Sequence, residues 1–378
     1  MSFLLLILIF TRPFISSLAF PYFNHVHSVL LIGALCIWAV RNRDEIQKSL
    51  GRLILQVSLF MAALLISFFF SDNKLAGAQE AYKYAAALLL LFFAASLPEV
   101  LKKRVISCIL LSGLLISILA IYQYFFGFRH LLDYINSQGI KDLFVIDSIG
   151  RKRVFFPFVT ANALAGYLAM LIPIALFHRK LRWCALPLSF ALLLTKSIGG
   201  LLSLLAGLIV YFALRGKIRK REIIAIGLSA GLAVMVFYIR SVTGQEHVRP
   251  GFSTIMRLGY WIDSFSLIAA HPLAGMGLGN FDLIESRYAH NSFLQIWAET
   301  GIFGIASFLW LIVSLLGRGI KNLKTSPDAA LSAGLISANL VFLAHNLIDF
   351  TFFLPEVSFT WWIISGLLVA ASASTLQR

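Results

Sequence analysis

Charged residues are scarce in this sequence: Asp, Glu, Lys and Arg make up 13% of the 378 residues, against about a quarter in a soluble domain. Hydrophobic residues make up 59%, and the mean hydropathy is +0.86. Apolar runs of about 20 residues recur along the chain, and each is long enough to cross a bilayer as a helix. These features exclude a soluble enzyme and a disordered chain, and they predict an all-α polytopic membrane protein.

Cysteine and acidic residues are also few. Cys36, Cys108 and Cys184 lie inside apolar runs, far from any Cys-x-x-Cys spacing. This spacing argues against a disulfide framework or a metal site and favours small core residues. The 17 acidic residues stand against 32 basic ones, which gives a formal net charge of +15. Whether that excess indicates nucleic-acid binding depends on where the basic residues lie.

About twelve segments meet the length and hydropathy expected of a membrane span. Arg12-Pro13 interrupts the first, which we keep as a retained span because it lacks the basic start and small-residue cleavage site of a signal peptide. The whole chain, 1–378, is predicted to form one integral-membrane domain. The predicted spans are 3–20, 26–40, 53–71, 78–96, 105–125, 155–177, 182–195, 198–214, 222–239, 291–316, 328–349 and 355–374.

The basic residues are distributed unevenly between the two sides of these spans. Connections after even-numbered spans hold more than half of the 32 Lys and Arg residues. The four short connections on the other side hold only Lys74 and Lys196. Since basic loops stay in the cytoplasm, this asymmetry predicts cytoplasmic termini and removes the argument for nucleic acid as a partner.

Two long segments, 126–154 and 240–290, fall on the predicted outer side. Connections of this length are uncommon between packed helices and are usually functional. Basic residues within 141–153 run against the charge rule, and binding of an anion is the natural explanation. Within 240–290, the stretch 254–270 predicts a helix lying along the membrane surface. Its apolar residues recur at helical spacing: Ile255, Leu258, Ile262, Phe265 and Ala269.

The run HPLAGMGLGNF follows this helix and is rich in turn residues. His271-Pro272 ends the helix, and Gly275, Gly277 and Gly279 allow sharp reversals of the backbone. Glycines at alternate positions can form an anion-binding nest of backbone N–H groups. A tight loop below the surface helix is the simpler alternative.

Three ionisable residues invite a chemical interpretation. Arg257 suits a phosphate ligand because a guanidinium keeps its charge and binds bidentately, although anchoring to lipid headgroups is the alternative. His290 at the start of span ten is a candidate general base for a sugar hydroxyl, or else a capping residue. Glu299 lies about 13 Å deeper on roughly the opposite face of that helix, so it cannot share a site with His290.

Near the end of span eleven, His345 and Asp349 lie one helical turn apart and can hydrogen-bond to each other. We interpret them as structural or supporting residues.

Taken together, these residues resemble the O-antigen ligase and O-antigen polymerase superfamily over roughly 150–365. One matching stretch runs from Arg153 through Phe158 and Asn162 to Pro173, and another comprises Thr195, Ser197 and Gly199. The most specific block consists of Arg257, Trp261, His271-Pro272-Leu273, Gly275-Met276-Gly277, Asn280-Phe281, His290-Asn291, Leu294, Glu299, Gly301 and Gly304.

The resemblance implies an integral-membrane glycosyltransferase of the bacterial inner membrane, with a GT-C type fold and an active site facing the periplasm. Members of the family take a glycan from undecaprenyl pyrophosphate. Ligases pass it to the lipid A core oligosaccharide, and polymerases pass it to another lipid-linked repeat unit. The resemblance implies no cofactor and no metal, and the chain has no Asp-x-Asp motif.

Carried over by position, the resemblance implies that Arg257 binds the donor pyrophosphate and that His290 acts on the acceptor hydroxyl. Direct attack on an α-linked sugar would then invert the anomeric centre. The positions expected to support this site are His271, Gly277, Asn280, Asn291, His345 and Asp349.

The sequence departs from the family pattern at two places. Ile198 stands where an Arg is usual, so Lys196 on the same short turn is the first candidate for the second phosphate-binding cation, and Arg153 is the fallback. Phe156-Pro157 stands where Gly-Thr is usual. The leading hypothesis is an O-antigen ligase; the alternatives are a polymerase with the same donor or a ligase of another surface glycan. A flippase or transporter fits less well, because the polar residues gather at one surface, with Lys83 and Glu299 as deep exceptions.

Overall fold

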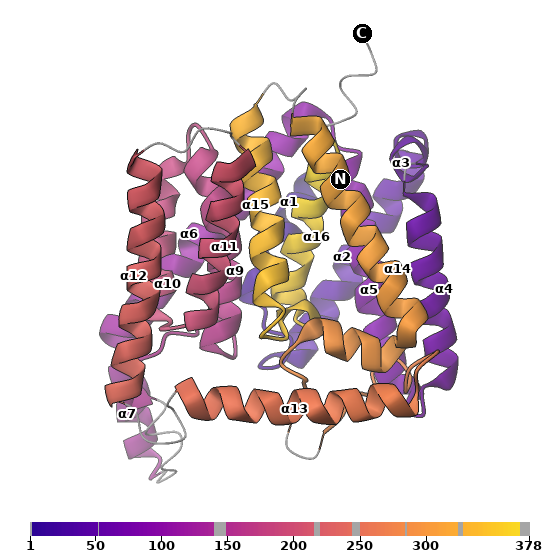
Figure 1. The fold of residues 1–378 in the computed structure, drawn as a ribbon. Helices are drawn as coiled ribbons and strands as arrows, with labels where there is room; N and C mark the ends of the chain where they lie inside the picture. The colour runs from indigo at the N-terminus through magenta and orange to yellow at the C-terminus, as the bar shows by residue number, and fades with distance from the viewer. Residues whose placement is uncertain are drawn as a thin grey trace.

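The computed structural model describes residues 2–51, 53–139, 149–214, 220–243, 250–283, 286–323 and 328–370. Helices are the only regular secondary structure in these ranges (Figure 1). Part of the basic outer segment, 140–148, lies outside the described residues. The elements, in chain order, are α1 (Ser2–Thr11), η1 (Arg12–Phe14), α2 (Pro21–Arg41), α3 (Arg43–Leu50), α4 (Ile54–Phe70), α5 (Lys74–Ala95), α6 (Glu99–Tyr122), η2 (Gln123–Gly127), α7 (Phe128–Ser137), α9 (Ala161–Phe177), η3 (Arg182–Cys184), α10 (Ala185–Leu194), α11 (Ile198–Leu214), α12 (Lys220–Thr243), α13 (Pro250–Ala270), α14 (Ser292–Leu323), α15 (Ala329–His345), η5 (Thr351–Phe353) and α16 (Pro355–Ala370).

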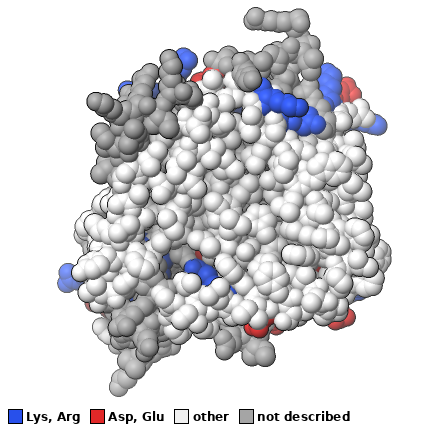
Figure 2. Space-filling model, viewed as in Figure 1, with Lys and Arg blue, Asp and Glu red and all other residues white. Residues whose placement is uncertain are grey.

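The helices form the bundle expected of a membrane protein. Among the described residues, three helical segments are long and apolar enough to cross a bilayer by themselves: α2, the continuous stretch Glu99–Ser137, and α14. Most of the others are shorter apolar helices. On the face shown in Figure 2 a broad white belt crosses the middle of the molecule, and charged atoms show mainly toward its two ends. Each predicted span contains a helix, while the number that cross the membrane stays a prediction.

Several predicted boundaries need correction. The first span ends at Phe14 rather than at residue 20. There the buried Arg12 guanidinium lies 3.7 Å from the Glu356 carboxylate of α16, so an ion pair satisfies the charge that interrupts the apolar run. The outer segment 126–154 begins as helix rather than loop, because α6 continues through η2 into α7. Cys36 is exposed, so it is not the core residue that the sequence predicts.

Close packing between α9, α11 and α15 depends on glycines. A Cβ on Gly207 of α11 would lie 2.2 Å from Cγ2 of Val341, and one on Gly166 of α9 would lie 2.5 Å from Cδ2 of His345. Small residues at such positions let helix backbones approach closely. The sequence of α9 and α11 thereby brings the end of α15, with His345, against both helices.

Helix α13 lies across one end of the bundle, where Figure 1 shows it nearly perpendicular to most of the other helices. Its apolar stripe is turned away from the protein, since Ile255 is 68% exposed and Ile262 66% exposed. Ser264 and Ile268 are buried against the bundle. The predicted helix is therefore confirmed as a helix. That its exposed stripe meets lipid stays a prediction.

The glycine-rich loop after α13 packs against a break in α14. Gly301 has φ 66° and ψ −170°, which interrupts the helix and frees backbone carbonyls one turn before it. The amides of Met276 and Gly277 donate to the carbonyls of Ala298 and Glu299, at 2.9 and 3.2 Å. These bonds fix the loop to α14, and they explain why the loop glycines and the Glu-x-Gly pair occur together.

The side chain of Glu299 completes this lock. One carboxylate oxygen accepts from the Gly279 amide at 3.0 Å, and the other accepts from Nε2 of Gln295 at 3.0 Å. The amide of Gly275 donates to the His271 carbonyl at 3.1 Å. Because these glycine amides are bonded within the protein, the anion-binding nest considered from the sequence is wrong, and the tight loop is correct.

Replacing Gly301 by alanine should destabilise the protein by roughly 1–3 kcal/mol or more, because L residues rarely adopt this conformation. The added Cβ would also lie 2.1 Å from the Leu273 carbonyl oxygen. Gly317→Ala in the same helix is the matched control, since nothing lies within 4 Å of its Cβ position. Thermal unfolding of the detergent-solubilised protein measures both variants. Equal melting temperatures for the two would contradict the role assigned to Gly301.

Candidate functional site

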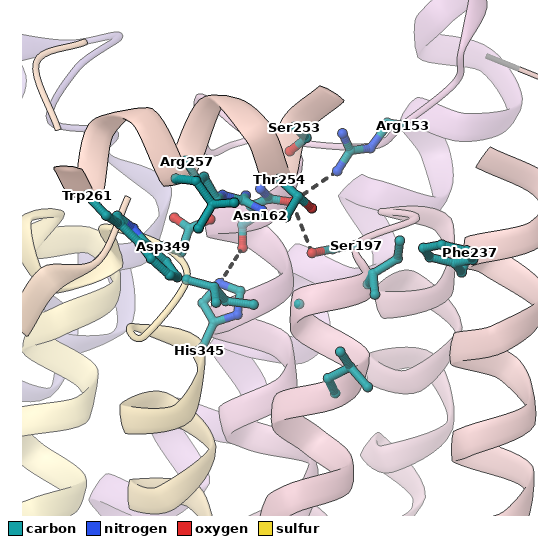
Figure 3. Close-up of a pocket in the computed structure, with 15 residues that line it drawn as sticks. Arg153, Asn162, Ser197, Phe237, Ser253, Thr254, Arg257, Trp261, His345 and Asp349 are labelled. Carbon is teal, nitrogen blue, oxygen red and sulfur yellow. Dashed lines mark hydrogen bonds between the residues drawn. The ribbon is translucent and has the colours of Figure 1, made fainter. Parts of the chain in front are cut away.

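A cavity of about 250 Å³ lies between α13 and the ends of α9, α11, α12 and α15 (Figure 3). Figure 2 shows blue and red atoms in a hollow of the white belt just above α13. A charged hollow at this position is chemically unlike the apolar surface around it. The lining residues are Arg153, Asn162, Ser197, Ile198, Gly199, Leu202, Phe237, Ser253, Thr254, Arg257, Leu258, Trp261, His345, Ile348 and Asp349.

Arg153 is held on one side of the cavity by the start of α9 and the end of α10. Its Nε donates to the Thr195 carbonyl at 3.0 Å, and one terminal nitrogen donates to Oδ1 of Asn162 at 3.0 Å. The Ser197 hydroxyl donates to the same Asn162 oxygen at 3.0 Å (Figure 3). This network fixes the guanidinium in one orientation at the cavity wall.

Arg257 enters the cavity from the opposite side, on α13. The Arg257 guanidinium makes no ion pair with a described residue and is half-buried. In Figure 3 its side chain points from α13 toward Asp349 and His345. Two guanidinium groups therefore reach one cavity from segments about 100 residues apart in the sequence.

His345 and Asp349 form the wall beneath Arg257. The sequence suggested that these two side chains could hydrogen-bond to each other. In the structure they do not. Nε2 of His345 instead lies 3.1 Å from the Asn162 carbonyl oxygen, and Oδ1 of Asp349 accepts from the Phe350 amide at 2.8 Å. Both residues line the cavity, so they contribute to its surface directly.

His290 lies beside the cavity, between α13 and the segment that follows Asp349. Its ring stacks on Tyr260 at a centroid distance of 5.7 Å and meets the edge of Phe350 at 4.9 Å. Burial lowers the pKa of His290 and the Arg257 cation lowers it further, whereas the Asp349 carboxylate raises it. The net shift of the His290 pKa is downward, which favours the neutral form of the imidazole. Its buried Nδ1 has no hydrogen-bond partner among the described residues.

Lys196 lies on the same turn but is directed elsewhere. Its Nζ donates to the Arg151 carbonyl at 2.8 Å, and its side chain lines a small apolar hollow with Met235 and Val236. Burial lowers the pKa of Lys196, and the nearby Arg153 and Lys152 cations lower it further. Of the two cations considered for the position opposite Arg257, only Arg153 lines the cavity.

Four of the predicted supporting residues lie elsewhere. Asn291 caps α14, with Oδ1 accepting from the Phe293 and Leu294 amides at 3.0 and 3.2 Å. His271, Gly277 and Asn280 lie at the other end of α13, in the loop that packs against α14. The described residues hold no group of three His, Cys, Asp or Glu side chains placed to bind a metal ion.

Three lining residues were given no role in the site by the sequence: Asn162 and Trp261, which appeared only in stretches that resemble the family, and Phe237, which was not singled out. Asn162 links Arg153, Ser197 and His345. Phe237 and Trp261 supply apolar surface from α12 and α13. Apolar residues in apolar helices carry no local signal of a site, whereas an Asn two positions into a buried helix does.

Comparison with known proteins finds similarity in the part of the chain that contains the cavity residue Arg257 and the neighbouring His290. Residues 183–309 match the family model described as O-antigen ligase, a range that includes Arg257, His290 and Glu299. A protein of Rickettsia prowazekii whose name describes it as a polysaccharide ligase is 26% identical over 213 residues. A polysaccharide ligase so named in Rickettsia typhi is 25% identical over 205 residues.

These matches are partial in both directions. The first covers 50% of this chain and 48% of the Rickettsia prowazekii protein, and the second covers 48% and 46%. The chain therefore matches about half the length of these relatives. The resemblance to the O-antigen ligase superfamily that the sequence indicates is confirmed.

Proposed function

We propose that this protein belongs to the O-antigen ligase superfamily and transfers a glycan from undecaprenyl pyrophosphate to a sugar hydroxyl of lipid A core oligosaccharide. The observation that carries the proposal is the meeting of Arg153 and Arg257 in one cavity, beside an imidazole whose neutral form is favoured. Guanidinium groups bind phosphate oxygens bidentately, so two of them suit a diphosphate group. The word ligase in the names of the relatives favours transfer to a separate acceptor over polymerisation.

The proposed reaction is a single displacement at the anomeric carbon of the donor sugar. The acceptor oxygen forms a bond to this carbon while the bond from the carbon to the pyrophosphate oxygen breaks. The proton of the acceptor hydroxyl passes to His290, acting as general base. Arg153 and Arg257 stabilise the charge that accumulates on the departing undecaprenyl pyrophosphate. If the donor sugar is α-linked, this reaction inverts the configuration at its anomeric carbon. The proposed mechanism uses no metal ion.

Charge distribution supports a periplasmic position for this site. Arg43 and Lys48 of α3, and Lys321 at the end of α14, lie at the opposite end of the bundle from α13 (Figure 1). Under the positive-inside rule the basic end faces the cytoplasm. We therefore assign the protein to the bacterial inner membrane, with the cavity between α13 and the bundle facing the periplasm, where lipid-linked glycans and lipid A core would meet.

The direct test is transfer by the purified chain in lipid nanodiscs. The donor is undecaprenyl-pyrophosphate-linked glycan extracted from the source cells, and the acceptor is their polymer-free lipopolysaccharide. We expect polymer-capped lipopolysaccharide on a gel, formed without nucleotide sugar and in the presence of a metal chelator. Lengthening of the lipid-linked glycan in the absence of acceptor would indicate a polymerase instead. Failure to transfer to any acceptor would contradict the proposal.

Alanine variants of Arg153 and Lys196 test which of these two residues provides the second contact to the donor pyrophosphate. We expect Arg153→Ala to lower kcat by about 10²-fold, the loss typical when one group that stabilises transition-state charge is removed. Lys196→Ala should change kcat by less than about threefold, because Nζ bonds a backbone carbonyl away from the cavity. Steady-state transfer kinetics measure both. A large loss in Lys196→Ala together with an active Arg153→Ala would reverse the assignment.

A further inference from the structure

A second and larger cavity, of about 680 Å³, lies at the other end of α13. It forms where the glycine-rich loop meets the turn between α4 and α5. His271, at the end of α13, lines this cavity, whereas Arg257 in the first half of the same helix lines the first one. One helix therefore connects the two cavities at the same end of the bundle (Figure 1).

The floor of the second cavity is held rigidly. Oδ1 of Asn280 accepts from the Ser71 hydroxyl at 3.0 Å and from the Asn73 amide at 3.3 Å. Gly279 has φ 73°, and a Cβ there would lie 2.6 Å from the Ala76 carbonyl oxygen. The loop and the turn thus hold each other in one arrangement. A surface fixed before a ligand arrives loses little conformational entropy on binding.

The side chains around this floor combine hydrogen-bonding groups with an exposed aromatic ring. Asp72 and Asp282 supply carboxylates, Arg287 supplies a guanidinium, and Phe70 is 62% exposed. Carboxylates accept from hydroxyl groups, a guanidinium donates to them, and an aromatic ring packs on the apolar face of a sugar. Since two carboxylates stand against one guanidinium, a phosphate or other polyanion fits poorly. A hydroxyl-rich neutral ligand fits well.

We propose that this second cavity binds an oligosaccharide segment of the substrate, several sugar units away from the bond that reacts. This inference rests on the proposed function. Trp261 and Arg257 line the first cavity 10 and 14 positions before His271, so lining residues of the two cavities lie about 15–21 Å apart along the helix. A glycan must therefore be longer than a few units to reach from one cavity to the other. The cavity then selects long glycans over short ones.

Equilibrium binding to the full chain in nanodiscs tests the proposal. The probe is the delipidated surface polysaccharide of the source cells, partly hydrolysed and separated into single sugars and longer oligomers. We expect the longer oligomers to bind. The double variant Asp72→Asn/Asp282→Asn should weaken this binding about tenfold or more, through lost charged hydrogen bonds. Asp263→Asn, an exposed position on α13 that lines neither cavity, is the matched control and should bind like the wild type.

Transfer kinetics identify which substrate carries the bound segment. Glycan length is varied first on the lipid-linked donor and then on the acceptor. In the double variant, the ratio of kcat/KM for long over short glycans should fall about tenfold in one of the two series. Phe70→Ala should lower the same ratio. Because Phe70 is exposed, this variant tests the cavity even if the double variant fails to fold.

The outcomes distinguish this proposal from the proposed function. If the wild-type protein binds oligomers through Asp72 and Asp282 but transfers no glycan, the proposed transferase function is contradicted and the proposed subsite is retained. If the wild-type protein is active but the double variant binds oligomers as tightly as the wild type, the proposed subsite is contradicted and the proposed transferase function is retained. Absence of any oligomer binding by wild-type protein would likewise overturn the subsite.

Discussion

Replacing Arg257 by alanine should lower kcat for glycan transfer by about 10²–10³-fold, the loss expected when one preorganised cation is removed from a developing negative charge. Arg257 has no ion pair with a described residue, so its charge is available to a ligand in the cavity. Arg257→Lys should recover only part of the activity, because an ammonium contacts phosphate as a point charge rather than a fork. Transfer by purified protein in nanodiscs measures both variants.

Arg129→Ala is the matched control for Arg257→Ala. Arg129 is exposed on α7 and does not line the cavity. Its loss should leave transfer close to the wild-type rate, while all three variants should insert and elute as well-folded protein. Wild-type transfer by Arg257→Ala would show that the cavity does not hold the donor pyrophosphate.

His290→Ala should lower kcat by about 10²–10⁴-fold, the range typical of a lost general base. The base works only when unprotonated, and burial with Arg257 keeps the pKa of His290 below its usual value. Activity of the wild type should therefore be constant around pH 7. It should fall only as the pH drops below about 6.5, through the lowered pKa.

The neighbours of His290 give this pH dependence a signature. Arg257→Gln removes the cation that lowers the pKa of His290, so the acid limb of the profile should move to higher pH. Asp349→Asn removes the carboxylate that raises it, so the limb should move to lower pH. Residual rates of each variant across the pH range measure both shifts. An unchanged acid limb in His290→Gln would contradict the assignment of His290 as the base.

The sequence predicted the helices well because hydropathy and periodicity are local properties. The predicted helix at 254–270 is real, and its exposed and buried sides agree with the spacing of Ile255 and Ile262 on one side and Ser264 on the other. Boundaries were less accurate where tertiary contacts override local pattern. The first helix ends at Thr11, directly before Arg12-Pro13, and the buried Arg12 there is paired with Glu356, more than 300 residues later.

The candidate site could be predicted only in part. Arg257 and His290 were found because each is an ionisable residue in an unusual position of a recognisable block. His271, Gly277 and Asn280 belong to the same block, yet they line or support a different cavity at the far end of α13. Proximity in sequence could not separate them, because a straight helix of 21 residues carries its two ends about 30 Å apart.

The sequence by itself determined that this chain is a helical membrane protein, that its cations gather at one side, and which family it resembles. Each of these follows from residue composition and from spacing within short segments. Only the tertiary structure decided that Arg153 rather than Lys196 lines the cavity opposite Arg257, and that Glu299 anchors the glycine loop. The direction of a side chain depends on segments distant in sequence that pack around it, and no local pattern records that packing.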